Sequence, residues 1–337
     1  MKIAFFEIEN WEKEFLKNKL KGNQLYFFEN ELNEKDIKEI EDVDIASIFI
    51  YSKITPKTIS KLKNLKAVIT RSTGFDHIDI KSCKKDNIKV FNVPFYGENT
   101  VAEHTFALIL ALSKNLIPSI DETRRGNFGM NIHNLRGFDL KDKTIGIVGM
   151  GHIGEHVARI AKGFEMKVIS HSPTKNIKLS KKIGFEYVSF EKLLKESDIV
   201  SLHAPYNKKT HHIINTKNIF LMKKGSMLIN TARGGLIDTT ALIKALDKKH
   251  LNAVGLDVLE EESLIKEERQ ILSKNFPKEA FYNIIENHIL FRYPNVIITP
   301  HNAFNSIEAL QRILDTTCDS IKYILAQSNY KNENRIC

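Results

Sequence analysis

Residues 141–173, KDKTIGIVGMGHIGEHVARIAKGFEMKVISHSP, decide the fold of this chain. A β-branched apolar run at 144–148 leads directly into the glycine motif GMGHIG at 149–154. Apolar residues then recur at helical spacing as far as Phe164, and a second apolar run begins at Met166. This order of strand, glycine turn, helix and strand is typical of the βαβ unit that binds a dinucleotide.

Each glycine of the motif has a separate physical task in such a unit. Gly149 allows the tight turn, Gly151 lets the backbone approach a pyrophosphate, and Gly154 lets the helix pack closely on the strand. The N–H groups and the positive dipole end of the helix then face the phosphates. The alternative is a βαβ unit whose glycines serve packing only.

Length and charge restrict the class of protein. A chain of 337 residues is long enough for two domains, each with its own core. The net charge of +9 comes from 50 Lys and Arg against 41 Asp and Glu, and the lysines are spread along the chain without a long basic block. This distribution favours a solvated surface that attracts anionic substrates over a nucleic-acid interface.

The cysteines and the apolar runs indicate a cytoplasmic protein. Cys83, Cys318 and Cys337 are scattered and show no spacing typical of a zinc site or a disulfide framework. The longest uncharged apolar run, 105–112, is far below the ~20 residues that span a bilayer. The N-terminal segment MKIAFFEIE reads as a strand rather than a secretion signal. We therefore expect no metal, no membrane and no nucleic acid.

Residues 1–99 alternate short apolar runs with amphipathic helices, which predicts a parallel sheet covered on both faces. The expected strands are 2–6, 24–27, 45–50, 67–70 and 88–91, and the expected helices are 11–19, 34–40, 56–62 and 78–85. A long apolar helix follows from Asn99 or Thr100 to Leu116 and should be buried. After Pro118, a loop-rich stretch is expected at 124–136.

The second half of the chain carries six β-runs, which suit a complete dinucleotide-binding sheet. They are 144–148, 167–170, 198–202, 226–230, 253–256 and 295–299. An amphipathic helix at 307–325 comes after this sheet is complete, so it should return to the first domain. We therefore expect an α/β protein with two doubly wound parallel-sheet domains: a discontinuous, flavodoxin-like substrate domain (1–99 plus 302–337) and a Rossmann domain (100–301).

Polar residues follow several strands of the second sheet, and the carboxyl ends of parallel strands share one edge, where ligands bind. They are His203, Thr231, Arg233, Asp257 and His301. Reduction of a carbonyl by a nicotinamide needs an acid for the oxygen and a cation for the substrate carboxylate. Histidine suits the first task and the planar fork of arginine suits the second.

The candidates are His301, Arg233 and one acid of the segment 257–262 (DVLEEE). Each has an alternative explanation. A histidine after a strand can be structural, Arg233 could bind a cofactor phosphate or a backbone carbonyl, and the acidic run could be a solvated helix start. Their shared place at one edge favours chemistry.

The motifs GMGHIG, INTARGGLID, VGLDVLEEE and VIITPHNAF together resemble the D-isomer-specific 2-hydroxyacid dehydrogenases over nearly the whole chain. The resemblance implies that Arg233 binds and polarises a 2-keto acid and that His301 is the acid–base group. It places the partner of His301 five residues after Asp257, at Glu262, and puts Asp257 beside the nicotinamide carboxamide. It also implies a homodimer, with the apolar helix at 101–112 as a possible interface.

The same resemblance implies a set of cofactor-binding residues along the carboxyl edge of the Rossmann sheet. They are Gly149, Gly151, His152, Ile153, Gly154, His171, Ser172, His203, Ala204, Pro205, Thr231, Ala232 and Asp257.

Further matches are similar to the D-lactate dehydrogenase branch of that family. Tyr51, Tyr96 and Phe304 match aromatic pocket positions, and the backbone N–H groups of Thr73 and Gly74 would take the substrate carboxylate. Core packing is the alternative for Tyr51 and Phe304. An aromatic pocket suits a methyl group, so the resemblance favours reduction of pyruvate to D-lactate.

The end of the second Rossmann strand departs from the NAD pattern. NAD-binding sheets usually carry an acid there for the ribose hydroxyls, but this chain has Ser172, no acid between Glu165 and Glu186, and several lysines. The sequence therefore leaves NAD, NADP and dual specificity all open. An NADPH-dependent glyoxylate or hydroxypyruvate reductase stays open as an alternative, as does a dinucleotide-sensing protein similar to the corepressors of this fold.

Overall fold

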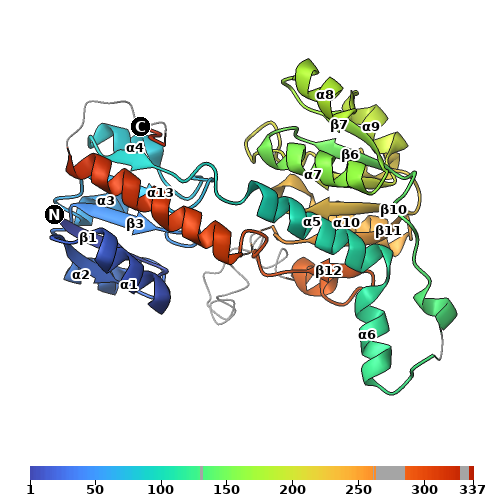
Figure 1. The fold of residues 1–337 in the computed structure, drawn as a ribbon, viewed down its shortest axis with the longest axis horizontal. Coiled ribbons are helices and arrows are strands. Elements are labelled where there is room, and N and C mark those ends of the chain that lie inside the picture. The colour runs from blue at the N-terminus through green and yellow to red at the C-terminus, as the bar shows by residue number, and fades with distance from the viewer. Residues whose placement is uncertain (130–131, 261, 263–284, 327–333) are drawn as a thin grey trace. The chain divides into compact units, whose positions relative to one another are not determined.

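The computed structural model describes residues 1–129, 132–260, 262, 285–326 and 334–337. The chain divides into two compact units, Met1–Tyr96 with Asn305–Cys337, and Gly97–Phe304. Each unit contains one sheet with helices on both faces (Figure 1). The α/β class with two parallel sheets is as predicted, and the unit boundaries lie three residues from the expected ones.

The first unit is a five-stranded parallel sheet in the order β2-β1-β3-β4-β5, the flavodoxin-like order. Its strands are β1 (Lys2–Phe5), β2 (Gln24–Phe27), β3 (Ile45–Ile48), β4 (Ala67–Thr70) and β5 (Lys89–Phe91). Helices α1 (Asn10–Lys19) and α13 (Ile307–Leu325) cover one face, and α2 (Glu34–Glu39), α3 (Pro56–Lys61) and α4 (Ile80–Lys85) cover the other. Helix α13 has the predicted bounds and packs in this unit.

The second unit is a seven-stranded parallel sheet in the order β12-β11-β10-β9-β6-β7-β8. Its strands are β6 (Thr144–Val148), β7 (Lys167–His171), β8 (Glu186–Tyr187), β9 (Ile199–Leu202), β10 (Ser226–Asn230), β11 (Leu251–Leu256) and β12 (Val296–Ile298). Six of these were predicted. The prediction missed β8 because two residues form no recognisable apolar run.

Helices α5 (Glu98–Ser113) and α7 (His152–Gly163) pack on one face of this sheet, while α9 (Phe190–Glu196) and α10 (Thr239–Asp247) pack on the other. Helix α8 (Ile177–Ile183) follows β7. The unit also contains three short 3-10 turns, η1 (Ile132–Leu135), η2 (Ile219–Leu221) and η3 (Gly234–Leu236).

Helix α5 is largely buried, as its apolar sequence predicts, and its N-cap is Gly97 rather than Asn99 or Thr100. The sequence analysis made no prediction for residues 117–123, which follow it. A further helix, α6 (Leu116–Arg124), occupies the stretch around Pro118. A proline in the first turn of a helix loses no hydrogen bond, which is why Pro118 does not prevent α6.

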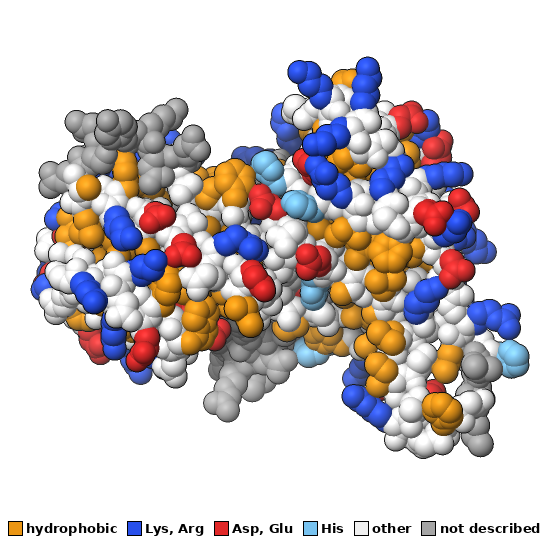
Figure 2. All heavy atoms as spheres, viewed as in Figure 1, with side chains coloured by type: hydrophobic (Ala, Val, Ile, Leu, Met, Phe, Trp, Pro, Cys, Tyr) orange, Lys and Arg blue, Asp and Glu red, His pale blue; other side chains and the backbone are white. Residues whose placement is uncertain are grey.

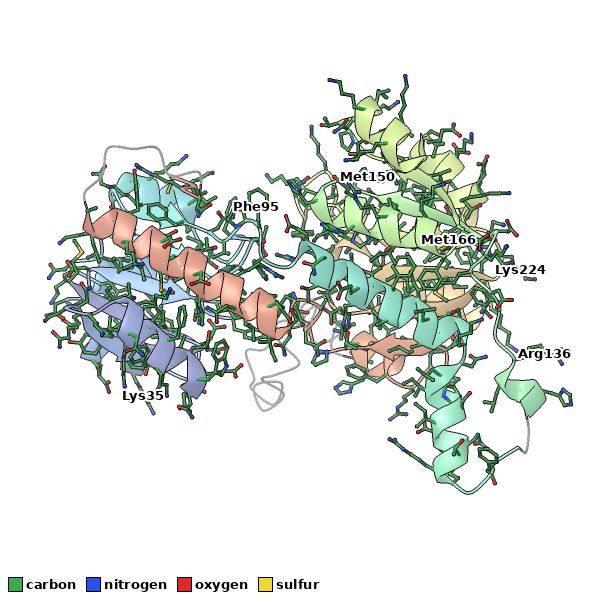
Figure 3. All side chains as sticks on the ribbon, in the orientation of Figure 1. Lys35, Phe95, Arg136, Met150, Met166 and Lys224 are labelled. Carbon is green, nitrogen blue, oxygen red and sulfur yellow. The ribbon has the colours of Figure 1, made fainter. Side chains whose placement is uncertain are left out.

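The glycine turn between β6 and α7 has the geometry that its sequence predicts. Gly149 has φ +96°, and a Cβ on Gly154 would lie 2.3 Å from the carbonyl oxygen of Gly149. A Cβ on Gly151 would instead meet nothing within 4 Å. Figure 3 labels Met150 and Met166 near the two ends of α7. Gly154 is thus a packing glycine, whereas Gly151 faces open space.

This difference predicts opposite outcomes for two alanine substitutions. Gly154→Ala should destabilise the protein by about 1–3 kcal/mol, because the new methyl group meets a backbone oxygen that cannot rotate away. The loss outweighs the ~1 kcal/mol that alanine gains over glycine inside a helix. Gly151→Ala should leave the free energy of urea unfolding within about 0.5 kcal/mol of wild type. Equal stability of the two variants would contradict the close packing of Gly154.

Candidate active site

Three candidate side chains lie at one edge of the second unit's sheet. Strands β10, β11 and β12 are neighbours and parallel, with Asn230 paired to Leu256 and Leu256 paired to Ile298. Asp257 directly follows β11, and Arg233 and His301 come three residues after the ends of β10 and β12. The sheet therefore brings together three residues that are far apart in the sequence.

His301 stands in a strained turn that a buried carboxylate holds. Its φ is +52°, in the left-handed region that non-glycine residues rarely adopt, and its N–H donates to the carbonyl of Thr299 at 2.9 Å. The Asp257 carboxylate, 1% exposed, accepts from Thr299 Oγ1 at 2.5 Å and from the N–H groups of Asn302 at 3.0 Å and Ala303 at 2.8 Å. Asp257 thus fixes the turn on both sides of His301.

His301 is paired with Glu262. The Nδ1 of His301 donates to Glu262 Oε1 at 2.6 Å, and the other carboxylate oxygen accepts from the N–H of Leu259 at 3.3 Å. A carboxylate in this position fixes the orientation of the imidazole and stabilises its protonated form. The family resemblance implies this same pairing of His301 with Glu262.

Glu260, a described acid close to Glu262 in the sequence, has other partners than His301. Glu260 accepts from His212 Nε2 at 2.6 Å and from Thr239 Oγ1 at 3.0 Å. Glu261 lies outside the described residues. The sequence analysis did not identify this second histidine–carboxylate pair.

Close backbone packing sets Arg233 beside the acidic segment. A Cβ on Gly234 would lie 2.1 Å from the carbonyl carbon of Leu259, so only glycine lets these two segments approach. Asn230 braces the turn by donating to the carbonyl of Arg233 at 2.8 Å and accepting from the N–H of Ala232 at 3.0 Å. The Arg233 guanidinium, half-buried, donates to the carbonyl of Ala232 at 2.8 Å.

The predicted cofactor residues all lie at the carboxyl edge of the same sheet. They lie at the end of or after β6 (Gly149, Gly151, His152, Ile153, Gly154), β7 (His171, Ser172), β9 (His203, Ala204, Pro205), β10 (Thr231, Ala232) and β11 (Asp257). In the described structure the Asp257 carboxylate is engaged in holding the His301 turn.

The residues of this edge fit a dinucleotide. Gly151 leaves open space at the start of α7 and has no side chain to cap the helix, so first-turn N–H groups can meet phosphates. Beside this turn, His203 has a buried Nδ1 with no hydrogen-bond partner among the described residues. Burial lowers the pKa of His203 to about 3, so its ring is neutral at physiological pH.

The end of β7 has the departure noted in the sequence. Ser172 comes directly after the strand, and the ring of His171 contacts the carbonyl of Val188 at 3.3 Å through Nδ1. The lysines that follow, Lys175, Lys178, Lys181 and Lys182, are exposed. Lysine and arginine side chains gather over α8 in Figure 2.

The predicted substrate-binding residues divide between the units. Tyr51, Thr73, Gly74 and Tyr96 belong to the first and Phe304 to the second. Within the described residues, the N–H groups of Thr73 and Gly74 donate to no protein acceptor. Tyr96 is nearly buried, and Phe304 lies beside Gly97.

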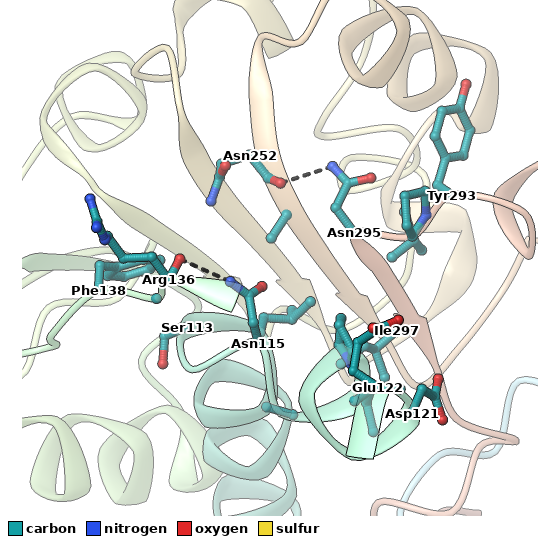
Figure 4. A pocket seen from close by; sticks show the side chains of 18 of the residues that line it. Ser113, Asn115, Asp121, Glu122, Arg136, Phe138, Asn252, Tyr293, Asn295 and Ile297 are labelled. Carbon is teal, nitrogen blue, oxygen red and sulfur yellow. Dashed lines mark hydrogen bonds between the residues drawn. The ribbon is translucent and has the colours of Figure 1, made fainter. Parts of the chain in front are cut away.

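A cavity of about 490 Å³ lies elsewhere in the second unit (Figure 4). Asn252 and Asn295, which line it, stand at the starts of β11 and β12 and are hydrogen bonded at 2.8 Å. The cavity is therefore at the opposite edge of the sheet from His301. The described residues include no cluster of three or more potential metal ligands and no helix long and apolar enough to cross a membrane.

Comparisons with known proteins identify the family of this chain. Residues 106–303 match the model of the D-isomer specific 2-hydroxyacid dehydrogenase NAD-binding domain. The chain is 31% identical to the D-lactate dehydrogenase of Escherichia coli over 99% of each protein. It is 35% identical to the glyoxylate reductase of Thermococcus litoralis over 85% of this chain and 81% of that protein.

A solved structure, the D-lactate dehydrogenase of Aquifex aeolicus complexed with NAD and lactic acid, has 37% identity to this chain. The similarity covers 96% of each chain with a TM-score of 0.87. The protein belongs to the D-isomer specific 2-hydroxyacid dehydrogenase family, close to its D-lactate dehydrogenases.

Proposed function

We propose that this dehydrogenase reduces pyruvate to D-lactate. The observation that carries the proposal is the hydrogen bond of 2.6 Å between His301 and Glu262 at the sheet edge that also bears Arg233. A histidine fixed by a carboxylate suits proton transfer to a substrate oxygen, and an arginine suits the substrate carboxylate.

A nicotinamide dinucleotide, when bound, supplies the hydride. Gly149, Gly151 and Gly154 with the start of α7 would hold its pyrophosphate, and the residues after β9 and β10 would line the rest of its site. Arg233 would orient the 2-keto acid and polarise its carbonyl. His301 would donate a proton from Nε2 to the carbonyl oxygen, while Glu262 at Nδ1 stabilises the protonated ring.

Aromatic side chains at the predicted substrate positions favour a small apolar substituent on the keto acid. We propose that Tyr51, Tyr96 and Phe304 select pyruvate, together with the N–H groups of Thr73 and Gly74, which have no acceptor among the described residues. Glyoxylate or hydroxypyruvate is the second candidate substrate, because the similar protein of Thermococcus litoralis is a glyoxylate reductase. A dinucleotide-sensing corepressor role would require the absence of turnover.

For the cofactor, we propose that NADPH is accepted alongside NADH. Ser172 follows β7 where an acid would repel a 2′-phosphate, and the nearby lysines are exposed cations. A cytoplasmic location stays a prediction from the cysteine usage and the short apolar runs.

We also propose a homodimer. Helix α6 has no buried residue within its own unit. Its apolar side chains Leu116, Ile117 and Ile120 are 49%, 46% and 36% exposed. The cavity of Figure 4 borders this helix at Ile117 and Pro118. Because α5 packs its apolar residues inside its own unit, α6 is the better surface for a second copy.

The substrate proposal predicts the outcome of a panel of 2-keto acids assayed with NADH and with NADPH. Pyruvate should have the highest kcat/KM, and the product should be D-lactate. NADPH should support turnover within about tenfold of NADH, because no carboxylate opposes the 2′-phosphate. A higher kcat/KM for glyoxylate or hydroxypyruvate would favour the reductase alternative, and an exclusive use of NADH would reject dual specificity.

The proposed role of Glu262 predicts a shifted pH profile. Glu262→Gln removes the charge that stabilises protonated His301, so the rate of reduction should fall at lower pH than in wild type. Glu260→Gln is the matched control, because Glu260 binds His212 and Thr239 instead. The pH dependence of kcat/KM checks this. If the pH profile shifts in Glu260→Gln and not in Glu262→Gln, Glu262 is not the carboxylate that acts with His301.

The dimer proposal predicts that light scattering reports twice the chain mass for wild type. Ile117→Asp in α6 should halve it, because a charge in an apolar interface has no partner. Ile177→Asp is the matched control, since Ile177 is 54% exposed in α8. A wild-type monomer, or an Ile117→Asp dimer, would contradict the α6 interface.

A further inference from the structure

The carboxylate of Glu7 in the first unit accepts several hydrogen bonds from the loop at residues 49–52. Glu7 follows β1 at the carboxyl edge of the sheet, and residues 49–52 follow β3 at the same edge. Glu7 Oε2 accepts from the N–H of Phe49 at 3.0 Å, the N–H of Ser52 at 3.2 Å and Ser52 Oγ at 2.6 Å. Glu7 Oε1 accepts from the N–H of Tyr51 at 2.9 Å. Four donors from one loop therefore converge on one side chain.

The backbone of Glu7 is fixed independently of that side chain. Its φ is +55°, and its N–H donates to the carbonyl of Asn30 at 3.0 Å. Its carbonyl oxygen accepts from Arg71 Nη2 at 2.6 Å, as does the carbonyl of Phe6. A substitution at position 7 that keeps the backbone will therefore act mainly on residues 49–52.

Arg71 connects the backbone of Glu7 to the predicted substrate-binding residues Thr73 and Gly74. It is 1% exposed, donates to Glu12 Oε1 at 3.0 Å, and lies 5.3 Å from the ring centroid of Phe49. Thr73 and Gly74 come two and three residues after it. Residue 7 thus anchors Tyr51 through its carboxylate and the 71–74 segment through its carbonyl.

We propose that Glu7 is a positioning residue for the substrate, acting through Tyr51. The inference rests on the proposed function, in which Tyr51 contacts the 2-keto acid. Backbone N–H groups that lose their acceptor must find water, which costs free energy and lets the loop move. The pairing of β1 with β3 uses main-chain groups and does not need the Glu7 carboxylate. Loss of that carboxylate should therefore displace Tyr51 without disrupting the sheet.

The test compares Glu7→Gln with Asp44→Asn. Glutamine has nearly the same shape, but its amide nitrogen cannot accept the N–H groups that bind one oxygen of Glu7. Asp44 is the matched control, because it anchors the opposite end of the same strands by accepting from the N–H of Lys2 at 2.8 Å and from Lys66 Nζ at 2.6 Å. Melting temperatures of both variants report any loss of stability, and steady-state kinetics with pyruvate report function.

Glu7→Gln should raise the KM for pyruvate about tenfold with kcat within about twofold of wild type, because substrate binding and not proton transfer is disturbed. The KM for the dinucleotide should not change. Asp44→Asn should lower the melting temperature and leave the KM for pyruvate at its wild-type value. Ser52→Ala, which removes only the hydroxyl donor, should raise the same KM by a smaller factor and serves if Glu7→Gln fails to fold.

A double-mutant cycle separates positioning from a general structural effect. In a Tyr51→Ala background, Glu7→Gln should change the KM for pyruvate by less than about twofold, because the side chain it positions is absent. An equal rise in KM in both backgrounds would overturn the inference. So would wild-type KM values in the folded Glu7→Gln and Ser52→Ala variants. A wild-type protein that reduces no 2-keto acid would overturn the proposed function, and this inference with it.

Discussion

The buried carboxylate of Asp257 is the constraint on which the candidate site depends. A left-handed residue other than glycine costs about 1–2 kcal/mol, and His301 adopts this conformation. Asp257 offsets the cost by accepting from Thr299, Asn302 and Ala303, the residues on either side of the histidine. Without that carboxylate the turn would relax, and the imidazole would no longer point at Glu262.

The two units share one structural feature at the carboxyl edges of their sheets. In each, a residue with positive φ stands at the carboxyl edge of a parallel sheet, and a carboxylate holds the neighbouring loop through backbone N–H groups. In the second unit the carboxylate of Asp257 holds the turn of His301. In the first unit Glu7 itself has the positive φ, and its carboxylate holds the loop of Tyr51. Strained loops at this edge are fixed by charge-assisted hydrogen bonds rather than by burial of apolar side chains.

The parts of the fold that follow a local pattern could be predicted from the sequence. The GMGHIG turn has a characteristic glycine spacing, and helix α13 has a helical apolar period. Both lie where they were predicted. Strand β8 and helix α6 were not predicted, because one is two residues long and the other contains Pro118. The pairing of Glu262 with His301 was expected only from the family resemblance, by counting from Asp257. The hydrogen bonds of Asp257, Glu260 and Glu7 join residues more than 20 positions apart, and no spacing in the sequence announces them.

The role of His301 is tested most directly by measuring dinucleotide binding and turnover separately in His301→Ala. Fluorescence titration with the reduced dinucleotide gives its Kd, and the rate of its oxidation by pyruvate gives kcat. We expect an unchanged Kd, because the glycine turn is intact, and a loss of about 10²–10⁴-fold in kcat, because proton transfer lacks its donor. A kcat equal to that of the wild type would remove His301 from the mechanism and contradict the account.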